Sequence, residues 1–262
     1  MRRTLSSIKL IISWNTLIVI LLATGATYLS IYYEWKVDFP LTIIGIAVVF
    51  PIVFSIGGAY SRRENALGQY GTIKGLGRAM FFASRDWIRD TGEDAEKSQN
   101  DFKQIFLDIF TKTREFFQTT DDINQEKKEE EIYSLFSKLS KIIEGLRDRG
   151  LSGSEVSRVN SHFSKMITSF ESLKHIFQYR TPRTLRSYSK IFIYIVPIVY
   201  APYFALLADG QPLGVAFIMP VLFALIFTSL DNIQEHLENP FDQLGEDDIK
   251  INAEKFTKTL DL

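Results

Sequence analysis

The sequence lacks cysteine altogether, which excludes disulfide bonds, thiolate metal ligands and cysteine nucleophiles. Histidine is scarce as well, and the three that occur, His162, His175 and His236, do not have the spacing of metal ligands. Also missing are a glycine-rich phosphate loop and a Gly-x-Ser-x-Gly turn, the usual marks of nucleotide-binding and hydrolytic sites. We therefore predict that the chain is not an enzyme and needs no cofactor.

A strong charge of either sign is missing too, because 30 basic and 31 acidic residues leave a net charge of -1. The sequence has no basic stripe interleaved with aromatics, so nucleic acid is not an expected partner. The charged residues are instead segregated from four long apolar runs, two near each end of the chain. This arrangement predicts an integral, multi-pass membrane protein with a cytosolic helical body.

The run over residues 41–60, LTIIGIAVVFPIVFSIGGAY, carries no charge for twenty residues and is followed by Ser-Arg-Arg. A helix of this length spans about 30 Å, the thickness of the hydrocarbon core of a bilayer. Within it Ile46, Phe50 and Phe54 recur at intervals of four, so they project from nearly one helix face. Spacing alone leaves two interpretations open: this face lines a pore, or it packs against lipid and other helices.

Three further runs complete the membrane part. The first, residues 10–33, follows three basic residues as a secretory signal does, but it is too long for one and ends in interfacial aromatics. The other two, 191–208 and 213–230, are separated by a tight turn. We predict an N-terminal transmembrane hairpin over 1–61, a cytosolic helical region over 62–190, a C-terminal transmembrane hairpin over 191–230 and an acidic cytosolic tail over 231–262.

The central region shows apolar residues at intervals of three and four in several stretches between residues 100 and 179, as amphipathic helices do. Residues 91–99, with glycine and dense charge, are predicted to form a loop before the first of them. The predicted fold class is therefore all-α, with four transmembrane segments and a cytosolic helical body inserted between the second and the third.

The distribution of basic residues near the ends of the runs predicts the orientation. Lys36 alone lies in the connection between the first two runs, whereas the side shared by the termini and the central body is basic. The positive-inside rule then places both termini and the body in the cytoplasm. The basic residues on that side are Arg2, Arg3, Lys9, Arg62, Arg63, Lys74, Arg78, Arg180, Arg183, Arg186 and Lys190.

Several short motifs near the apolar runs resemble the bestrophin family of ion channels. Residues 59–62 (AYSR), followed by 70–71 (YG), are similar to the family's stretch after its second helix. Residues 179–205 (YRTPRTLRSYSKIFIYIVPIVYAPYFA) resemble the entry to the third segment of bacterial members. Residues 238–241 (ENPF), with 247–249 (DDI) nearby, resemble the acidic Asn-Pro-Phe motif after the fourth segment. The motifs occur in the family's order.

The resemblance has limits in this chain. Residues 91–178 match only in helical character, and Arg63 and Glu64 stand where the family usually has two tryptophans. The chain therefore resembles a divergent, bacterial branch, for which the inner (plasma) membrane is the expected location. The resemblance implies a homopentamer in which the second helix of each subunit lines a narrow neck. Counting back from Arg62, the neck positions fall on Ile46, Phe50 and Phe54.

Five copies of this stripe would form three rings of apolar side chains, a constriction that blocks conduction by dewetting and passes ions when widened. Phenyl rings favour an anion with their edges and a cation with their faces, and the sequence does not fix which is turned to the axis. Similarity to anion-selective animal members favours an anion channel, with chloride as the ion. The alternatives are a cation-permeable channel of the same fold and a non-conducting membrane scaffold or sensor.

Two other sites come from the resemblance. Val156 is the candidate for a second, cytosolic aperture, and its ordinary interpretation is a packed helix residue. Glu246, Asp247 and Asp248 could bind calcium, which takes clustered carboxylates. In calcium-activated relatives the acidic run follows the Asn-Pro-Phe motif almost directly, whereas residues 242–245 intervene here. This interval favours a solvated acidic tail, or carboxylates at a helix N-terminus, over a calcium site.

Overall fold

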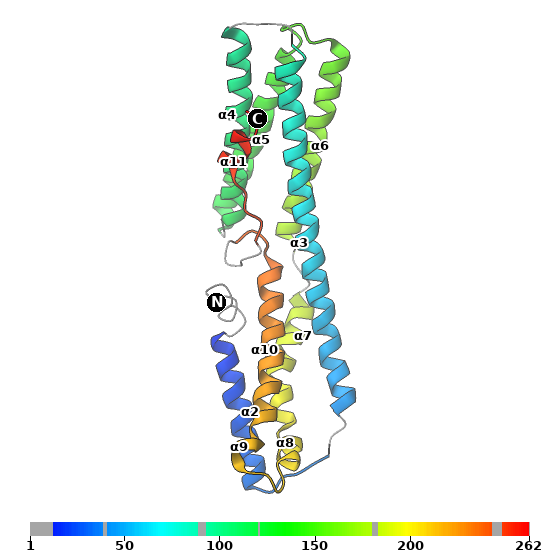
Figure 1. Cartoon of the computed structure of the whole chain (residues 1–262), viewed down its shortest axis with the longest axis vertical. Helices are drawn as coiled ribbons and strands as arrows, with labels where there is room; N and C mark the ends of the chain where they lie inside the picture. The colour runs from blue at the N-terminus through cyan, green and yellow to red at the C-terminus, as the bar shows by residue number, and fades with distance from the viewer. Residues whose placement is uncertain are drawn as a thin grey trace. The chain divides into compact units, whose positions relative to one another are not determined.

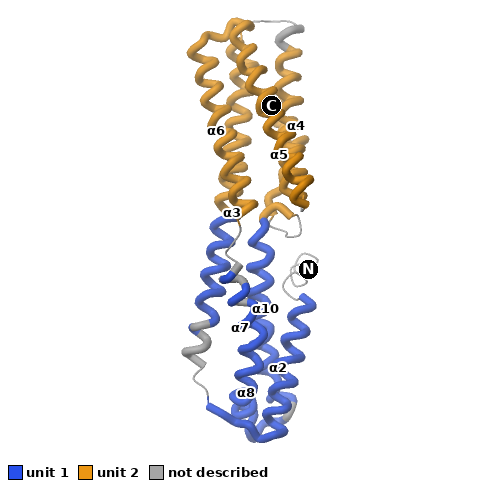
Figure 2. Tube along the Cα trace, turned by 180° about the vertical axis from the view of Figure 1, so that it is seen from behind, with its two compact units in different colours: residues 1–63, 180–239 blue, residues 64–179, 240–262 orange. Residues whose placement is uncertain are grey.

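A computed structural model of the chain describes residues 13–38, 41–88, 93–119, 121–179, 183–242 and 248–261. The regular structure of these residues is helical throughout, which confirms the all-α prediction (Figure 1). The chain forms two compact units (Figure 2). Unit 1 is residues 1–63 and 180–239, and unit 2 is residues 64–179 and 240–262. The longest helix, α3 (Leu41–Asp86), contributes its first part to unit 1 and the remainder to unit 2.

Unit 1 is a bundle in which α2 packs against α7, α8 and α10 (Figure 1). Its apolar core includes Val19 of α2, Ile52 of α3 and Phe227 of α10. The buried hydroxyls of Thr27, Ser30 and Thr228 bond within their own helix, as Thr228 does through a 2.8 Å hydrogen bond to the carbonyl of Ala224, so they need no water. Besides α3, the helices of unit 1 are α2 (Trp14–Tyr32), α7 (Arg183–Val199), α8 (Ala201–Leu207), α9 (Leu213–Ala216) and α10 (Ile218–Glu238).

Two helical segments of the described residues are long and apolar enough to cross a membrane, Trp14–Tyr32 and Gly214–Glu238. A third candidate is the α7–α8 pair, which is bent by 43°. The bend is explained by Pro202 in the first turn of α8, because proline supplies no N–H to continue the preceding helix. Two or three of the four predicted segments thus have the required form, and the segment at 41–60 stays a prediction.

The connecting segments of unit 1 meet at one end of its bundle. Lys36 Nζ lies 2.8 Å from Asp209 Oδ1, and this hydrogen bond holds the pKa of the Asp209 carboxyl below its ordinary value. The backbone N–H of Val37 also donates to the carbonyl of Pro202, at 3.4 Å. The loop after α2 is therefore tied to the region around α8, although the ion pair is largely solvated and contributes little to stability.

Unit 2 contains the second part of α3 with α4 (Glu93–Gln118), α5 (Asp122–Gly145), α6 (Gly153–Gln178) and α11 (Ala253–Lys258). Side-chain caps start three of these helices: Asp121 accepts from the N–H of Asn124, Ser152 from that of Glu155 and Asn252 from that of Lys255. The predicted loop at 91–99 is wrong over most of its length, since α4 begins at Glu93. Acidic residues suit a helix N-terminus, so the charge cluster starts a helix here.

The core of unit 2 is rich in phenylalanine. The Phe256 ring of α11 lies 4.5 Å from that of Phe110 and 5.9 Å from that of Phe106, both on α4. Glycine at position 77 of α3 leaves room for this docking, because a Cβ there would lie 3.1 Å from Phe256 Cζ and the ring would have to shift slightly. The buried phenylalanines of this core are Phe81, Phe102, Phe106, Phe110, Phe116, Phe117, Phe136, Phe163, Phe170, Phe177, Phe241 and Phe256.

A polar cluster joins α5 to α6. Lys174, whose side chain is only 13% exposed, lies 2.9 Å from Glu129, 2.7 Å from Glu171 and 2.7 Å from the Tyr133 hydroxyl, which also bonds to Glu171. Burial alone would lower the pKa of Lys174, but these hydrogen bonds outweigh it and raise the pKa above its ordinary value. The cluster therefore keeps a charged ammonium at a helix contact that is otherwise apolar.

The two units differ in where their large apolar side chains lie. Among the described residues, the exposed large hydrophobic side chains of unit 2 are four: Leu67, Trp87, Ile123 and Tyr179. All the others, which include residues of α2, α3, α7 and α10, belong to unit 1. Unit 1 thus presents an apolar surface on several helices, whereas unit 2 keeps its apolar side chains inside.

Candidate functional site

The candidate site is one face of the first part of α3. Ile46, Phe50 and Phe54 are exposed there by 61%, 60% and 63%. Their spacing of four places them one above another on the helix, and Val49 and Val53, also exposed, lie beside them. The stripe that the sequence spacing predicted is therefore an exposed apolar surface. None of the residues that the structure describes covers it.

The opposite face of the same helix segment is packed. Val48, Ile52, Ser55 and Ala59 are buried, at intervals of three and four, in the core of unit 1. The two faces are about half a turn apart at 100° per residue. The packed face fixes the rotation of α3 within unit 1, so the exposed direction of Phe50 and Phe54 follows from the packing of their neighbours.

The two phenylalanine rings of the stripe contact each other. Their centroids are 4.7 Å apart and their planes are inclined by 73°, an edge-to-face arrangement. Further along the helix, Gly57 and Gly58 are also exposed, and a Cβ at either would meet nothing within 4 Å. The large side chains of this face therefore end at Phe54, and the exposed positions 57 and 58 have no side chain.

The other sequence-predicted site residues do not join this stripe. Val156, at the start of α6, is 7% exposed and belongs to the apolar core of unit 2, as expected of a packed helix residue. A role for it in a cytosolic aperture stays a prediction. Glu246 and Asp247 lie outside the described residues, and Asp248 is partly exposed next to the buried Ile249. Within the described part of the chain, no group of three acidic or histidine side chains could hold a metal ion.

Solved structures of a bacterial protein resemble most of the chain. A single-substitution variant of a bacterial bestrophin homologue from Klebsiella pneumoniae superposes with a TM-score of 0.77 at 17% identity, over 93% of this chain and 96% of that one. A second variant gives 0.74 at 17% identity, over 93% and 97%, and a further crystal structure 0.72 at 17%, over 93% and 95%. The chain has a bestrophin fold.

The bestrophin fold confirms the resemblance drawn from the motifs, and it extends over residues 91–178, where the sequence matches only in helical character. At 17% identity the likeness is one of fold. No protein-family model matches the sequence, and no curated protein matches it.

Sequence reasoning missed one part of the bestrophin fold in this chain, the docked C-terminal segment. Residues 248–261 lie in unit 2 and include α11, where the prediction had only an acidic tail. Phe241 of the Asn-Pro-Phe motif stacks on Phe117 of α4 at 4.2 Å and 10°. The signal available in the sequence was Asn252 as a helix cap four residues before Phe256, within a strongly charged context.

Proposed function

We propose that this chain forms a homopentameric ion channel in a membrane, with a neck built by the α3 stripe of five subunits. Ile46, Phe50 and Phe54 would each supply one apolar ring. Narrow apolar rings exclude water and so block ions, and a small widening rewets them. Neck opening and closing is then a change in the radius of these rings.

The observation that carries the proposal is the exposure of these three side chains while the opposite face of α3 is packed. An exposed apolar stripe on one helix needs lipid or another protein surface to cover it. Lipid would cover this stripe equally well, so the proposal needs a second support. That support is the bestrophin fold, because the resemblance to the bestrophin family leads us to expect assembly of the subunits around the second helix.

We propose anions, chloride in particular, as the permeant ions. The Phe50 and Phe54 rings are nearly perpendicular, so an ion on the pore axis cannot lie directly over the faces of both. At least one ring then turns part of its positive edge inward, which favours an anion over a cation. The competing proposal, a cation-permeable channel of the same fold, requires mainly ring faces at the axis.

Planar-bilayer recording of the purified protein in asymmetric salt tests this proposal. Currents that reverse near the chloride equilibrium potential support the anion channel, and reversal near the cation potential rejects anion selectivity but keeps conduction. Phe50→Ala combined with Phe54→Ala should change conductance or gating. Leu21→Ala, at an exposed position of α2, is the matched control and should leave the currents unchanged.

The proposal includes no resident cofactor. Residues 242–245 separate the Asn-Pro-Phe motif from Glu246, Asp247 and Asp248, so the acidic run is displaced from the place it has in calcium-activated relatives. We expect the same open probability with and without a calcium chelator. A loss of current on chelation, restored by calcium and abolished in Asp247→Asn, would establish a calcium site instead.

The topology follows from the basic residues near the run ends: both termini and unit 2 would lie in the cytoplasm of a bacterial cell, with unit 1 in the inner membrane. A non-conducting scaffold or sensor is the second candidate, because the charged surface of unit 2 could bind partner proteins. Pentamers that form an axial opening but pass no ions under any tested voltage or salt would favour this candidate. Neither candidate assigns catalysis to the chain.

A further inference from the structure

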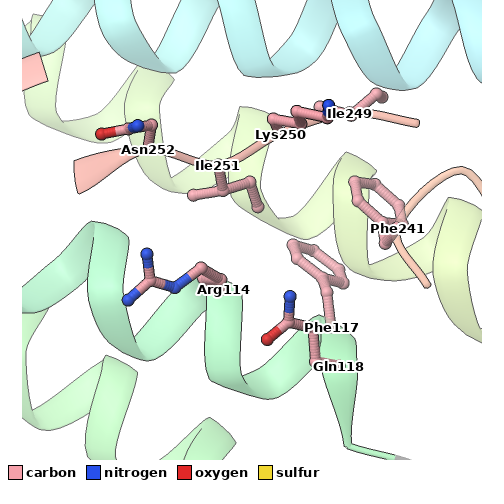
Figure 3. Close-up of a pocket in the computed structure, with 8 residues that line it drawn as sticks. All are labelled: Arg114, Phe117, Gln118, Phe241, Ile249, Lys250, Ile251 and Asn252. Atoms are coloured by element: carbon pink, nitrogen blue, oxygen red, sulfur yellow. The ribbon is translucent and has the colours of Figure 1, made fainter. Parts of the chain in front are cut away.

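A pocket of about 200 Å³ lies in unit 2 between the last turns of α4 and the C-terminal segment (Figure 3). One wall is Arg114, Phe117 and Gln118 of α4. The other consists of Phe241 and residues 249–252, which lead into α11 without regular secondary structure. The volume equals that of about six or seven liquid water molecules, so the pocket suits a small metabolite.

The C-terminal segment that forms one wall of this pocket is held at both ends. At one end the N–H of Ile249 donates to the carbonyl of Pro240 at 2.8 Å, and at the other Asn252 Oδ1 accepts from the N–H of Lys255 at 2.7 Å. The next turn of α11 is anchored by the buried Phe256. Because both ends of the segment are fixed, the space between it and α4 is a built feature of unit 2.

The chemistry of the walls is unequal. The stacked rings of Phe117 and Phe241 and the side chain of Ile251 form an apolar part. Arg114 and Lys250 give the rest of the lining two positive charges. In Figure 3 the Arg114 side chain runs beside α4, away from the stacked rings of Phe117 and Phe241. A pocket with one apolar end and one cationic end selects a ligand with the matching two ends.

Arg114 is well placed to bind an anion. Its side chain is 36% exposed, and its Nη1 lies 3.8 Å from Glu254 Oε2, beyond the 2.7–2.9 Å typical of a strong charge-assisted hydrogen bond. The guanidinium fork can bind both oxygens of a free carboxylate with parallel hydrogen bonds, and this long contact leaves it available to do so.

We propose that this pocket binds a small carboxylate with a short apolar body, its carboxylate on Arg114 and its body against Phe117 and Phe241. Ile251 belongs to the same apolar part of the lining, so the bound molecule also contacts residues 249–252 and bridges them to α4. Binding therefore holds the C-terminal segment in its docked position. The proposal is independent of ion conduction and of the number of subunits.

Calorimetric titration of the purified full chain in detergent tests the proposal, with benzoate as the probe and benzamide as its neutral counterpart of equal shape. Benzoate should bind saturably, one per chain, and benzamide at least about tenfold more weakly, since it lacks the charge that pairs with Arg114. Benzoate should also slow amide hydrogen exchange in residues 248–252. No benzoate binding, or equal binding of benzamide, overturns the proposal without any variant.

Two substitutions locate the site. Arg114→Gln should weaken benzoate binding at least about tenfold. Glu254→Gln removes the same ion pair from the other side and should leave binding unchanged or tighter, because it removes a competing carboxylate. Arg114→Lys, which keeps the charge but loses the fork, should fall between them. Benzoate that binds Arg114→Gln as tightly as the natural chain lies elsewhere, and the proposal is then wrong.

Discussion

Units 1 and 2 are both helical, but they use apolar side chains in opposite ways. Unit 1 exposes leucine, isoleucine and phenylalanine on α2, α3 and α10 and buries small residues such as Ala23, Ala59 and Ala224 between its helices. Unit 2 buries its phenylalanines in one core cluster and exposes charged residues. The first pattern fits helices surrounded by lipid or by other subunits, and the second fits a body surrounded by water.

The comparison also divides α3 along its length. In its first part the exposed face carries Phe50 and Phe54, whereas in its second part Gly68, Gly71 and Gly75 are exposed with nothing near them. Glycine inside a helix costs about 1 kcal/mol relative to alanine, so these positions are not chosen for helix stability. One continuous helix thus has a bulky apolar face in unit 1 and a nearly bare one in unit 2.

The largest effect is expected from the core of unit 2. Phe256→Ala removes a buried ring that contacts Phe106 and Phe110, and it should lower the free energy of unfolding by about 3–5 kcal/mol. Ile123→Ala, exposed in the same unit, should change it by less than about 0.5 kcal/mol. Urea unfolding followed by circular dichroism measures both. Equal effects of the two substitutions would mean that α11 is not part of the core.

Placing the same charge on the surface of each unit tests directly whether the two surfaces have different surroundings, lipid for unit 1 and water for unit 2. Leu21→Asp puts a carboxylate on the exposed face of α2 and should cost about 2.5–3.5 kcal/mol of membrane insertion. Ile123→Asp, on the exposed surface of unit 2, should leave insertion unchanged. The membrane-inserted fraction of each variant, measured by protease protection in vesicles, gives the answer. Normal insertion of Leu21→Asp would show that this face of α2 does not contact lipid.

The polar cluster of unit 2 should have an intermediate effect. Lys174→Met leaves Glu129 and Glu171 together without their cation, and the free energy of unfolding should fall by about 1–3 kcal/mol. The carboxylates are partly solvated, which keeps the loss below that of a fully buried pair. Lys165→Met, exposed on the same helix, is the control for the charge change and should have almost no effect. A loss of equal size in both variants would assign the effect to net charge.

The smallest expected effect is the difference in stability between alanine substitutions at two glycines of α3, Gly75 and Gly77. Gly75→Ala gains helix propensity in open space and should stabilise the chain by up to about 1 kcal/mol. Gly77→Ala gains the same propensity but brings a Cβ to 3.1 Å from Phe256, so its net effect should be smaller or destabilising. Thermal unfolding of the two variants side by side measures the difference. Equal stabilisation would show that Phe256 yields without cost.

The sequence predicts much of this architecture, because a long periodic pattern of apolar residues can be recognised from residue type and spacing alone. The four apolar runs, the amphipathic helices of unit 2 and the stripe of Ile46, Phe50 and Phe54 are all stated by residue type and spacing. Pro197 and Pro202 both suggest a break in the third run, and the structure places it at Pro202 while Pro197 stays inside α7. Which proline interrupts a helix depends on neighbouring contacts that sequence does not give.

The docked C-terminal segment is harder to predict for a physical reason. A six-residue helix such as α11 is not stable by propensity and forms because Phe256 is buried by other helices. Its sequence, AEKFTK, has too few apolar residues to show a period. The pocket beside Arg114 is likewise created by the meeting of α4 with a segment more than 120 residues later in the chain. Such sites depend on long-range packing alone.

The absence of cysteine makes one measurement especially direct, because a single introduced cysteine is the only thiol in the chain. In the reconstituted protein, a charged, water-soluble thiol reagent should modify Phe54→Cys and change the current at once, since this position faces the aqueous path in the proposed neck. Leu21→Cys, at an exposed position of α2 that would face lipid in the proposed channel, should react slowly and leave the current unchanged. Equal, slow reaction at both positions, with an unaltered current, would contradict a pore lined by the exposed face of α3.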